Sequence, residues 1–91
     1  TPRGKELVIS VASLRLDAVL SRGFGIGRGD AADLIRAGRV QIDHHLCTKT
    51  DQTVGEEALV TVRGKGRLRL KGATGTSKSG RVQVLAERFG S

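Results

Sequence analysis

Aromatic side chains are nearly absent from this sequence, in which Phe24 and Phe89 are the only Phe, Tyr or Trp residues. Proteins that bind single-stranded nucleic acid usually stack the bases on aromatic rings. The shortage therefore argues against a single-strand reader of that type. If the partner is RNA, the shortage favours a folded RNA that is recognised through its backbone, groove shape and 2′-hydroxyl groups.

Three further shortages limit the class of protein. Cys47 is the single cysteine, so no internal disulfide forms, which is compatible with a reducing compartment. No apolar run approaches the roughly 20 residues of a membrane span, and no signal-peptide core is present, so we expect a soluble chain without a membrane partner. Methionine is absent even at position 1, which predicts a processed or excised piece of a longer protein.

Acidic residues are missing from residues 58–86, a segment of about a third of the chain. Residues 1–57 hold eight Lys/Arg and eight Asp/Glu, whereas residues 58–86 hold seven basic residues and no acid. This segment accounts for the formal net charge of +7 and the pI near 10.8. Like charge at this density is better tolerated where an anion neutralises it, so it favours a polyanion as partner. The seven basic residues are Arg63, Lys65, Arg67, Arg69, Lys71, Lys78 and Arg81.

The basic residues from Arg63 to Lys71 recur at every second position. On an extended strand they would form a stripe on one side, with Val60, Val62, Leu68 and Leu70 on the other side against a core. The alternative is the solvated face of an ordinary amphipathic strand, although such a face normally mixes its signs. Lys and Arg that neutralise phosphates release counterions, which supplies much of the affinity for nucleic acid.

Apolar periodicity predicts two helices followed by strands, an α+β order. The first helix spans about Ser13–Arg22, a glycine-rich turn covers 23–27, and the second helix runs from about Asp30 to a stop at Gly38. The apolar stretch Leu7–Val11 adds a strand or packs across the body. After Gly38 the period falls to two, with a turn at Asp43-His44. The expected strands are 40–42, 46–48, 58–62 and 81–85, with a loop at 72–80.

Four segments in this order resemble an S4 RNA-binding domain. They are Arg15-Leu16-Asp17-Ala18-Val19-Leu20, Gly25-Ile26-Gly27-Arg28, Leu34-Ile35-Arg36-Ala37-Gly38-Arg39-Val40 and Val60-Thr61-Val62-Arg63-Gly64-Lys65-Gly66-Arg67. The resemblance covers about Ser13–Arg69. With the two ends of the chain added, the sequence most resembles the C-terminal region of the bacterial cell-division-cluster and cyanobacterial photosystem II S4-domain proteins.

The resemblance implies an S4-like fold (alpha-L motif), with two short helices packed on a small, mainly antiparallel sheet. It divides the chain into a lead-in segment (1–12), the S4-like domain (13–71), and a basic loop with the closing strand of the same domain (72–91). It also implies a cytoplasmic, monomeric module of a longer bacterial protein, with a plastid stroma as the alternative location. The expected partner is structured RNA, ribosomal or transfer, and the ribosome itself is a candidate.

The same resemblance, the basic stripe and the helix face on which Arg22 follows Arg15 by seven positions give the residues expected to contact phosphates. For each arginine the alternative is helix solubility or a pair with Asp17, Asp30 or Asp33. Where the family usually places a hydroxyl residue, then Arg and Ser, this chain has Gly27-Arg28-Gly29, which removes possible phosphate hydrogen bonds. The expected contacts are Arg15, Arg22, Arg28, Arg36, Arg39, Lys49, Arg63, Lys65 and Arg67.

Other chemistries find little support. His44, His45 and Cys47 form an H-H-x-C group, but zinc normally needs three or four ligands, and their adjacency on a short hairpin does not assemble a Cys-His nucleophile. The glycines of 23–29 follow a predicted helix and not the strand that a dinucleotide fingerprint requires. We therefore expect no catalytic residue, metal or cofactor. Two alternatives stay open: a module that binds an acidic protein, and the accessory domain of an RNA-modifying enzyme.

Overall fold

The first helix begins where backbone from a distant segment satisfies its amide groups. The computed structural model describes residues 4–76 and 80–90, and in it α1 spans Leu16–Phe24. The Leu16 N–H donates to the Gln52 carbonyl at 2.9 Å, and the Asp17 N–H donates to the Thr50 carbonyl at 3.1 Å. These bonds satisfy two of the donors that every helix start leaves open. The prediction of a start near Ser13 was therefore wrong by three residues.

The end of α1 also lies later than predicted. Gly23 and Phe24 belong to the helix, and Gly25 ends it in the left-handed conformation at φ 67°, which glycine adopts without steric cost. Helix α2 spans Arg28–Arg36, so it begins two residues before the predicted Asp30. Gly27 occupies its N-cap and, within the described residues, no side chain caps the helix there.

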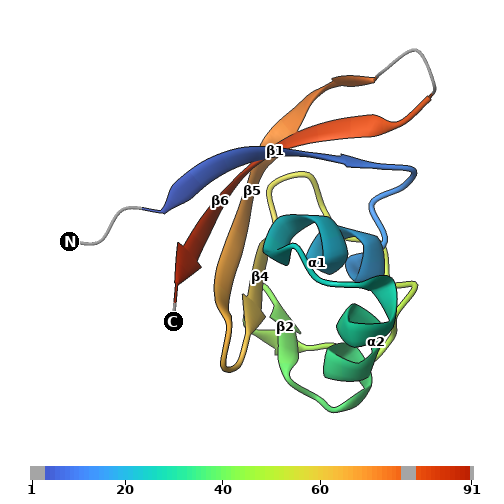
Figure 1. Cartoon of the computed structure of the whole chain (residues 1–91), viewed down its shortest axis with the longest axis vertical. Helices are drawn as coiled ribbons and strands as arrows, with labels where there is room; N and C mark the ends of the chain where they lie inside the picture. The colour runs from blue at the N-terminus through green and yellow to red at the C-terminus, as the bar shows by residue number, and fades with distance from the viewer. Residues whose placement is uncertain (1–3, 77–79, 91) are drawn as a thin grey trace.

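A six-stranded antiparallel sheet completes the described part of the chain, which confirms the expected α+β fold with two helices packed on a small sheet. Figure 1 shows α1 and α2 side by side against one side of it. The strand order is β1-β6-β5-β4-β2-β3. The strands are β1 (Lys5–Val11), β2 (Val40–Ile42), β3 (His45–Leu46), β4 (Leu59–Val62), β5 (Gly66–Thr76) and β6 (Val82–Gly90).

The core lies between the helix pair and the helix-facing side of β4, β5 and β6. Helix α1 contributes three fully buried aliphatic side chains and α2 contributes Ile35, as their helical spacing predicted. Gly23 lies so close to Leu68 that an added Cβ would overlap it, so α1 packs tightly on β5. The buried strand residues that face the helices include Val60, Val62, Leu68, Leu70, Val84 and Ala86.

The expected continuous basic stripe is interrupted. Arg63, Gly64 and Lys65 form the turn between β4 and β5, so Arg63 and Lys65 lie at the tip of a hairpin. Only Arg67, Arg69 and Lys71 belong to β5, on the side opposite the buried Leu68 and Leu70. Basic residues recur at every second position on both sides of the turn because side chains alternate between inward and outward along each arm of the hairpin. The sequence pattern therefore does not reveal where the turn lies.

Four other expectations about strands are resolved. The stretch from Gly72 to Thr76, predicted as loop, continues β5 with register shifts after Leu70 and after Ala73, while residues 77–79, including Lys78, lie outside the described residues. The closing strand is confirmed and extends to Gly90. The turn at Asp43-His44 is confirmed, although the return strand is His45–Leu46 and not 46–48. The apolar stretch near the start forms β1, which pairs with β6.

No helix within residues 4–76 and 80–90 combines the length and apolarity needed to cross a membrane.

Candidate nucleic-acid interface

A buried carboxylate holds two of the predicted arginines. Asp17 is only 6% exposed, and its Oδ2 accepts hydrogen bonds from Arg15 Nη2 at 3.2 Å and from Arg28 Nη2 at 3.1 Å. Its Oδ1 accepts the Ala18 N–H at 2.8 Å, which fixes the carboxylate on the first turn of α1. The arginine side chains remain 45% and 57% exposed, so Asp17 orients two cations that still face solvent.

The turn between the helices brings Arg28 to Asp17 from eleven positions along the chain. Ser21 Oγ donates to the Ile26 carbonyl at 2.6 Å, and the Ile26 N–H donates back to the Ser21 carbonyl at 3.1 Å. This reciprocal pair fixes the turn between α1 and α2. The first residue of α2 is thereby held over α1, and the alternative considered for Arg15 and Arg28, pairing with Asp17, is what the structure shows.

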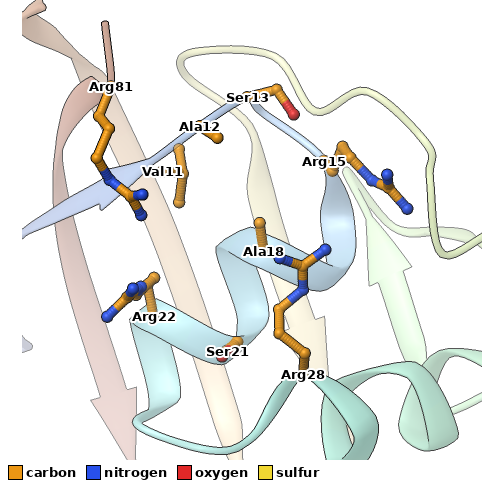
Figure 2. Close-up of a pocket in the computed structure, with 9 residues that line it drawn as sticks. All are labelled: Val11, Ala12, Ser13, Arg15, Ala18, Ser21, Arg22, Arg28 and Arg81. Carbon is orange, nitrogen blue, oxygen red and sulfur yellow. The ribbon is translucent and has the colours of Figure 1, made fainter. Parts of the chain in front are cut away.

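Four arginines line one pocket of about 390 Å³, which we call the arginine pocket. Figure 2 shows Arg15 and Arg28 on one side of it and Arg22 and Arg81 on the other. Small side chains leave its space open, and none of its lining residues is acidic. The lining residues are Val11, Ala12, Ser13, Arg15, Ala18, Ser21, Arg22, Arg28 and Arg81.

Three more of the predicted residues gather at the tip of the β4–β5 hairpin, a group we call the hairpin cluster: Arg39, Arg63 and Lys65. The Arg63 N–H donates to the Arg39 carbonyl at 2.9 Å, which joins the hairpin to the chain that leaves α2. Arg39 and Lys65 line a second concave region of about 390 Å³ together with Asp30 and Asp33. The acids reduce the local positive charge, so this cluster is less cationic than the arginine pocket.

The remaining predicted residues line neither of these two concave regions. Arg36 is exposed, and its Nη1 lies 3.9 Å from Asp33 Oδ1, a weak surface pair. Lys49 is exposed on the segment that leads to Thr50, whose carbonyl caps α1. Arg67 is exposed on the side of β5 that faces away from the core. The structure therefore divides the nine predicted residues among several surfaces.

Lys71 is the stripe residue most clearly committed to acids. Its Nζ lies 3.1 Å from Glu6 Oε2 and 3.6 Å from Glu87 Oε1, which joins β5 to β1 and β6. The hydrogen bond to Glu6 is the main cause that raises the pKa of the Lys71 ammonium above its usual 10.5. Lys71 therefore connects three strands of the sheet, and much of its charge is balanced locally.

Arg81 was absent from the predicted contacts, although it lies in the arginine pocket. Its Nε donates to Ser10 Oγ and its Nη2 to the Ser10 carbonyl, both at 3.2 Å. The signal available in the sequence was its membership of the acid-free segment 58–86. Its neighbours could not be read from the sequence, because they depend on the pairing of β1 with β6.

Within the described ranges, His, Cys, Asp and Glu side chains form no group of three that could hold a metal ion. Cys47 is a partly buried thiol whose Sγ donates to the Lys49 carbonyl at 3.7 Å. The hairpin that carries His44 and His45 is exposed, and its two turn residues, Asp43 and His44, adopt the left-handed conformation with φ 50° and 69°.

Comparison with known proteins agrees with this geometry. The sequence profile of the S4 domain family matches residues 14–60, just over half of the chain. The chain belongs to the S4 domain family, and S4 domains are RNA-binding modules. This confirms the resemblance found in the sequence, and the matched range contains Arg15, Arg22 and Arg28.

A solved structure shares the fold. A crystal structure of a pseudouridylate synthase aligns with a TM-score of 0.54 and 24% sequence identity over 58% of this chain. The aligned part is 23% of the synthase, so this chain matches less than a quarter of that protein. A comparison with curated protein sequences finds no match.

Proposed function

We propose that this S4 domain docks on structured RNA, ribosomal or transfer RNA, through three arginines of the helix pair: Arg15 at the N-cap of α1, Arg22 in α1 and Arg28 at the start of α2. The observation that carries the proposal is the arginine pocket, which arginine side chains from α1, from α2 and from the residue before α1 line together. Arginine stays charged at any physiological pH and matches phosphate oxygens in a planar fork. A phosphate bound there would relieve the repulsion among these cations.

The bonds that Asp17 forms with Arg15 and Arg28 favour binding of RNA in a fixed orientation over unoriented attraction between charges. A cation on a free side chain loses conformational entropy when it binds, whereas a guanidinium already held by a carboxylate loses less. Arg15 and Arg28 are held in this way, and more than two-fifths of each side chain is still exposed. The scarcity of aromatic rings further supports contact with backbone and groove over base stacking.

The proposed role is noncatalytic and belongs to a ribosome-related or translation-related process. We place it in a monomeric module of a longer protein, in the bacterial cytoplasm or a plastid stroma. These assignments rest on the sequence resemblance. A second candidate, the accessory domain of an RNA-modifying enzyme, draws support from the occurrence of a similar fold within the longer pseudouridylate synthase chain. It predicts the same RNA binding, with conversion of the RNA by another domain.

The test is binding across a salt series to a transfer RNA, a single-stranded RNA and a duplex DNA of equal length. We expect the transfer RNA to bind most tightly, and about five neutralised phosphates would give a slope of log affinity against log salt near −3.5 to −4.5. Equal binding to all three would contradict docking on structured RNA. Binding to polyglutamate but not to RNA would indicate an acidic protein partner.

Matched variants locate the surface. Arg22→Gln with Arg28→Gln removes two charges from the arginine pocket, and Arg67→Gln with Arg69→Gln removes two charges from the opposite side of β5. We expect the pocket variant to reduce the steepness of the slope by about 1.4 to 1.8, and the control to leave it near the wild-type value. Equal losses in the two variants would contradict the pocket as the contact.

A further inference from the structure

The arginine pocket receives a cation from outside the matched S4 region. Arg81 lies 21 positions after Val60, the last residue matched by the family profile, and it precedes β6. The fold nevertheless brings its guanidinium to the residues that end β1 and begin α1. Helix residues and a residue beside the last strand therefore face the same space.

Ser10 orients Arg81 through two hydrogen bonds, one to its hydroxyl and one to its carbonyl, both at 3.2 Å. The sheet does not need this contact to join β1 to β6, because the two strands already pair from Lys5 to Val11. A guanidinium held at two of its nitrogens has a fixed plane. The contact thus sets the direction in which Arg81 presents its charge.

The charge balance of the pocket is uneven. Asp17 bonds Arg15 and Arg28, which lie on one side, while Arg22 and Arg81 lie on the other. Four guanidinium groups line an open volume of about 390 Å³, and among the described residues that line it none is acidic. The buried Asp17 carboxylate bonds two of the four, so the described lining carries an excess of positive charge. Because arginine does not lose its proton at neutral pH, an anion is the means of relieving this excess.

We propose that the RNA-binding surface continues from the helix pair onto the end of the sheet, where Arg81, oriented by Ser10, binds a backbone phosphate together with Arg22. This inference rests on the proposed function and deepens it. The RNA footprint would then cover β1 and the start of β6 as well as the S4 helices.

The test compares Arg81→Gln with Arg69→Gln, since each removes one arginine charge and Arg69 lies on the opposite side of β5. For transfer RNA we expect Arg81→Gln to reduce the steepness of the salt slope by about 0.7 to 0.9. We also expect it to weaken binding about tenfold. Arg69→Gln should bind like the wild type. Equal effects of the two substitutions, or no effect of Arg81→Gln, would overturn the proposal.

Two further proteins complete the experiment. If Arg81→Gln fails to fold by circular dichroism, Arg81→Lys replaces it, and weaker binding at an unchanged slope is expected because lysine keeps the charge but lacks the planar fork. Unchanged affinity of Arg81→Lys would then overturn the proposal. The Arg22→Gln, Arg28→Gln protein distinguishes failure of the proposed function from failure of its extension to Arg81. If this protein loses affinity while the Arg81 variants do not, only the extension to the sheet fails. If wild-type protein does not bind transfer RNA, the proposed function itself fails.

Discussion

At the scale of single residues, Asp17 connects folding to the interface. One carboxylate accepts an amide N–H on the first turn of α1 and bonds two arginines, one directly before α1 and one at the start of α2. Burial of a charge is costly unless it is paired and hydrogen-bonded, and here all of these conditions are met. The same contacts that make the acid tolerable in the interior also fix the direction of Arg15 and Arg28.

Asp17→Ala should lower the free energy of unfolding by about 1 to 3 kcal/mol, because it removes a buried acceptor and leaves two arginines facing each other. Urea denaturation followed by circular dichroism measures this change. Asp33→Ala is the matched control, since the Asp33 side chain is 80% exposed and, among the described residues, pairs only with Arg36, at 3.9 Å. The control should change stability by less than about 0.5 kcal/mol. Equal losses would show that Asp17 has no special role.

At the scale of elements, the sequence predicted the type and order of the helices and strands better than the residues at which they begin and end. The α+β order and the two helices follow from local periodicity. The start of α1 does not, because carbonyls of Thr50 and Gln52 set it from more than thirty positions away. The hairpin at 63–65 was missed although Gly64 and Gly66 are turn signals, because the alternation of basic residues continued through it.

The residues of the interface, like the ends of the helices, could be predicted only where distant strand pairing does not decide their position. Arg15 and Arg28 were predicted from the S4 resemblance, and Arg22 was predicted as a basic residue seven positions after Arg15. All three line one pocket. Arg81 was not predicted, because its place depends on which strand pairs with β6. The separation of Arg67 from the pocket also depends on strand geometry, since side chains on the two sides of β5 differ only by the parity of their positions.

Gly23→Ala should reveal how tightly α1 packs on β5. Alanine favours helix by about 1 kcal/mol over glycine, but the new methyl group would overlap Leu68, which is fully buried and cannot move aside freely. Overpacking costs about 1 to 3 kcal/mol, so we expect a net loss of stability. Gly29→Ala in α2 is the control, since its added methyl group meets no neighbour within 4 Å and should raise stability by about 0.5 to 1 kcal/mol. Thermal denaturation of both proteins checks the signs, and a rise for Gly23→Ala would contradict tight packing.

At the scale of the whole molecule, the excess of seven positive charges does not act as one surface. Part of it lies in the arginine pocket, part in the hairpin cluster, and part on the far side of β5. Lys71 is bound to two acids and ties together three strands. Net charge therefore predicts attraction to a polyanion, while the fold decides which of the charges meet it.

The contacts of Lys71 should make the stability of the protein depend on pH in the alkaline range. The hydrogen bond to Glu6, with the nearby charges of Glu6 and Glu87, raises the pKa of Lys71 above 10.5, so the folded state holds this proton more tightly than the unfolded state. Its contribution is complete below pH 10.5 and is lost as the pH rises through the higher folded value. The melting temperature of the wild type should therefore fall in that range.

Glu6→Gln removes the main cause of the raised Lys71 pKa and should make the melting temperature fall less steeply with pH. Glu57→Gln, at an exposed turn before β4, should follow the wild-type curve. Parallel curves for all three proteins would show that the Lys71 contact adds nothing to stability.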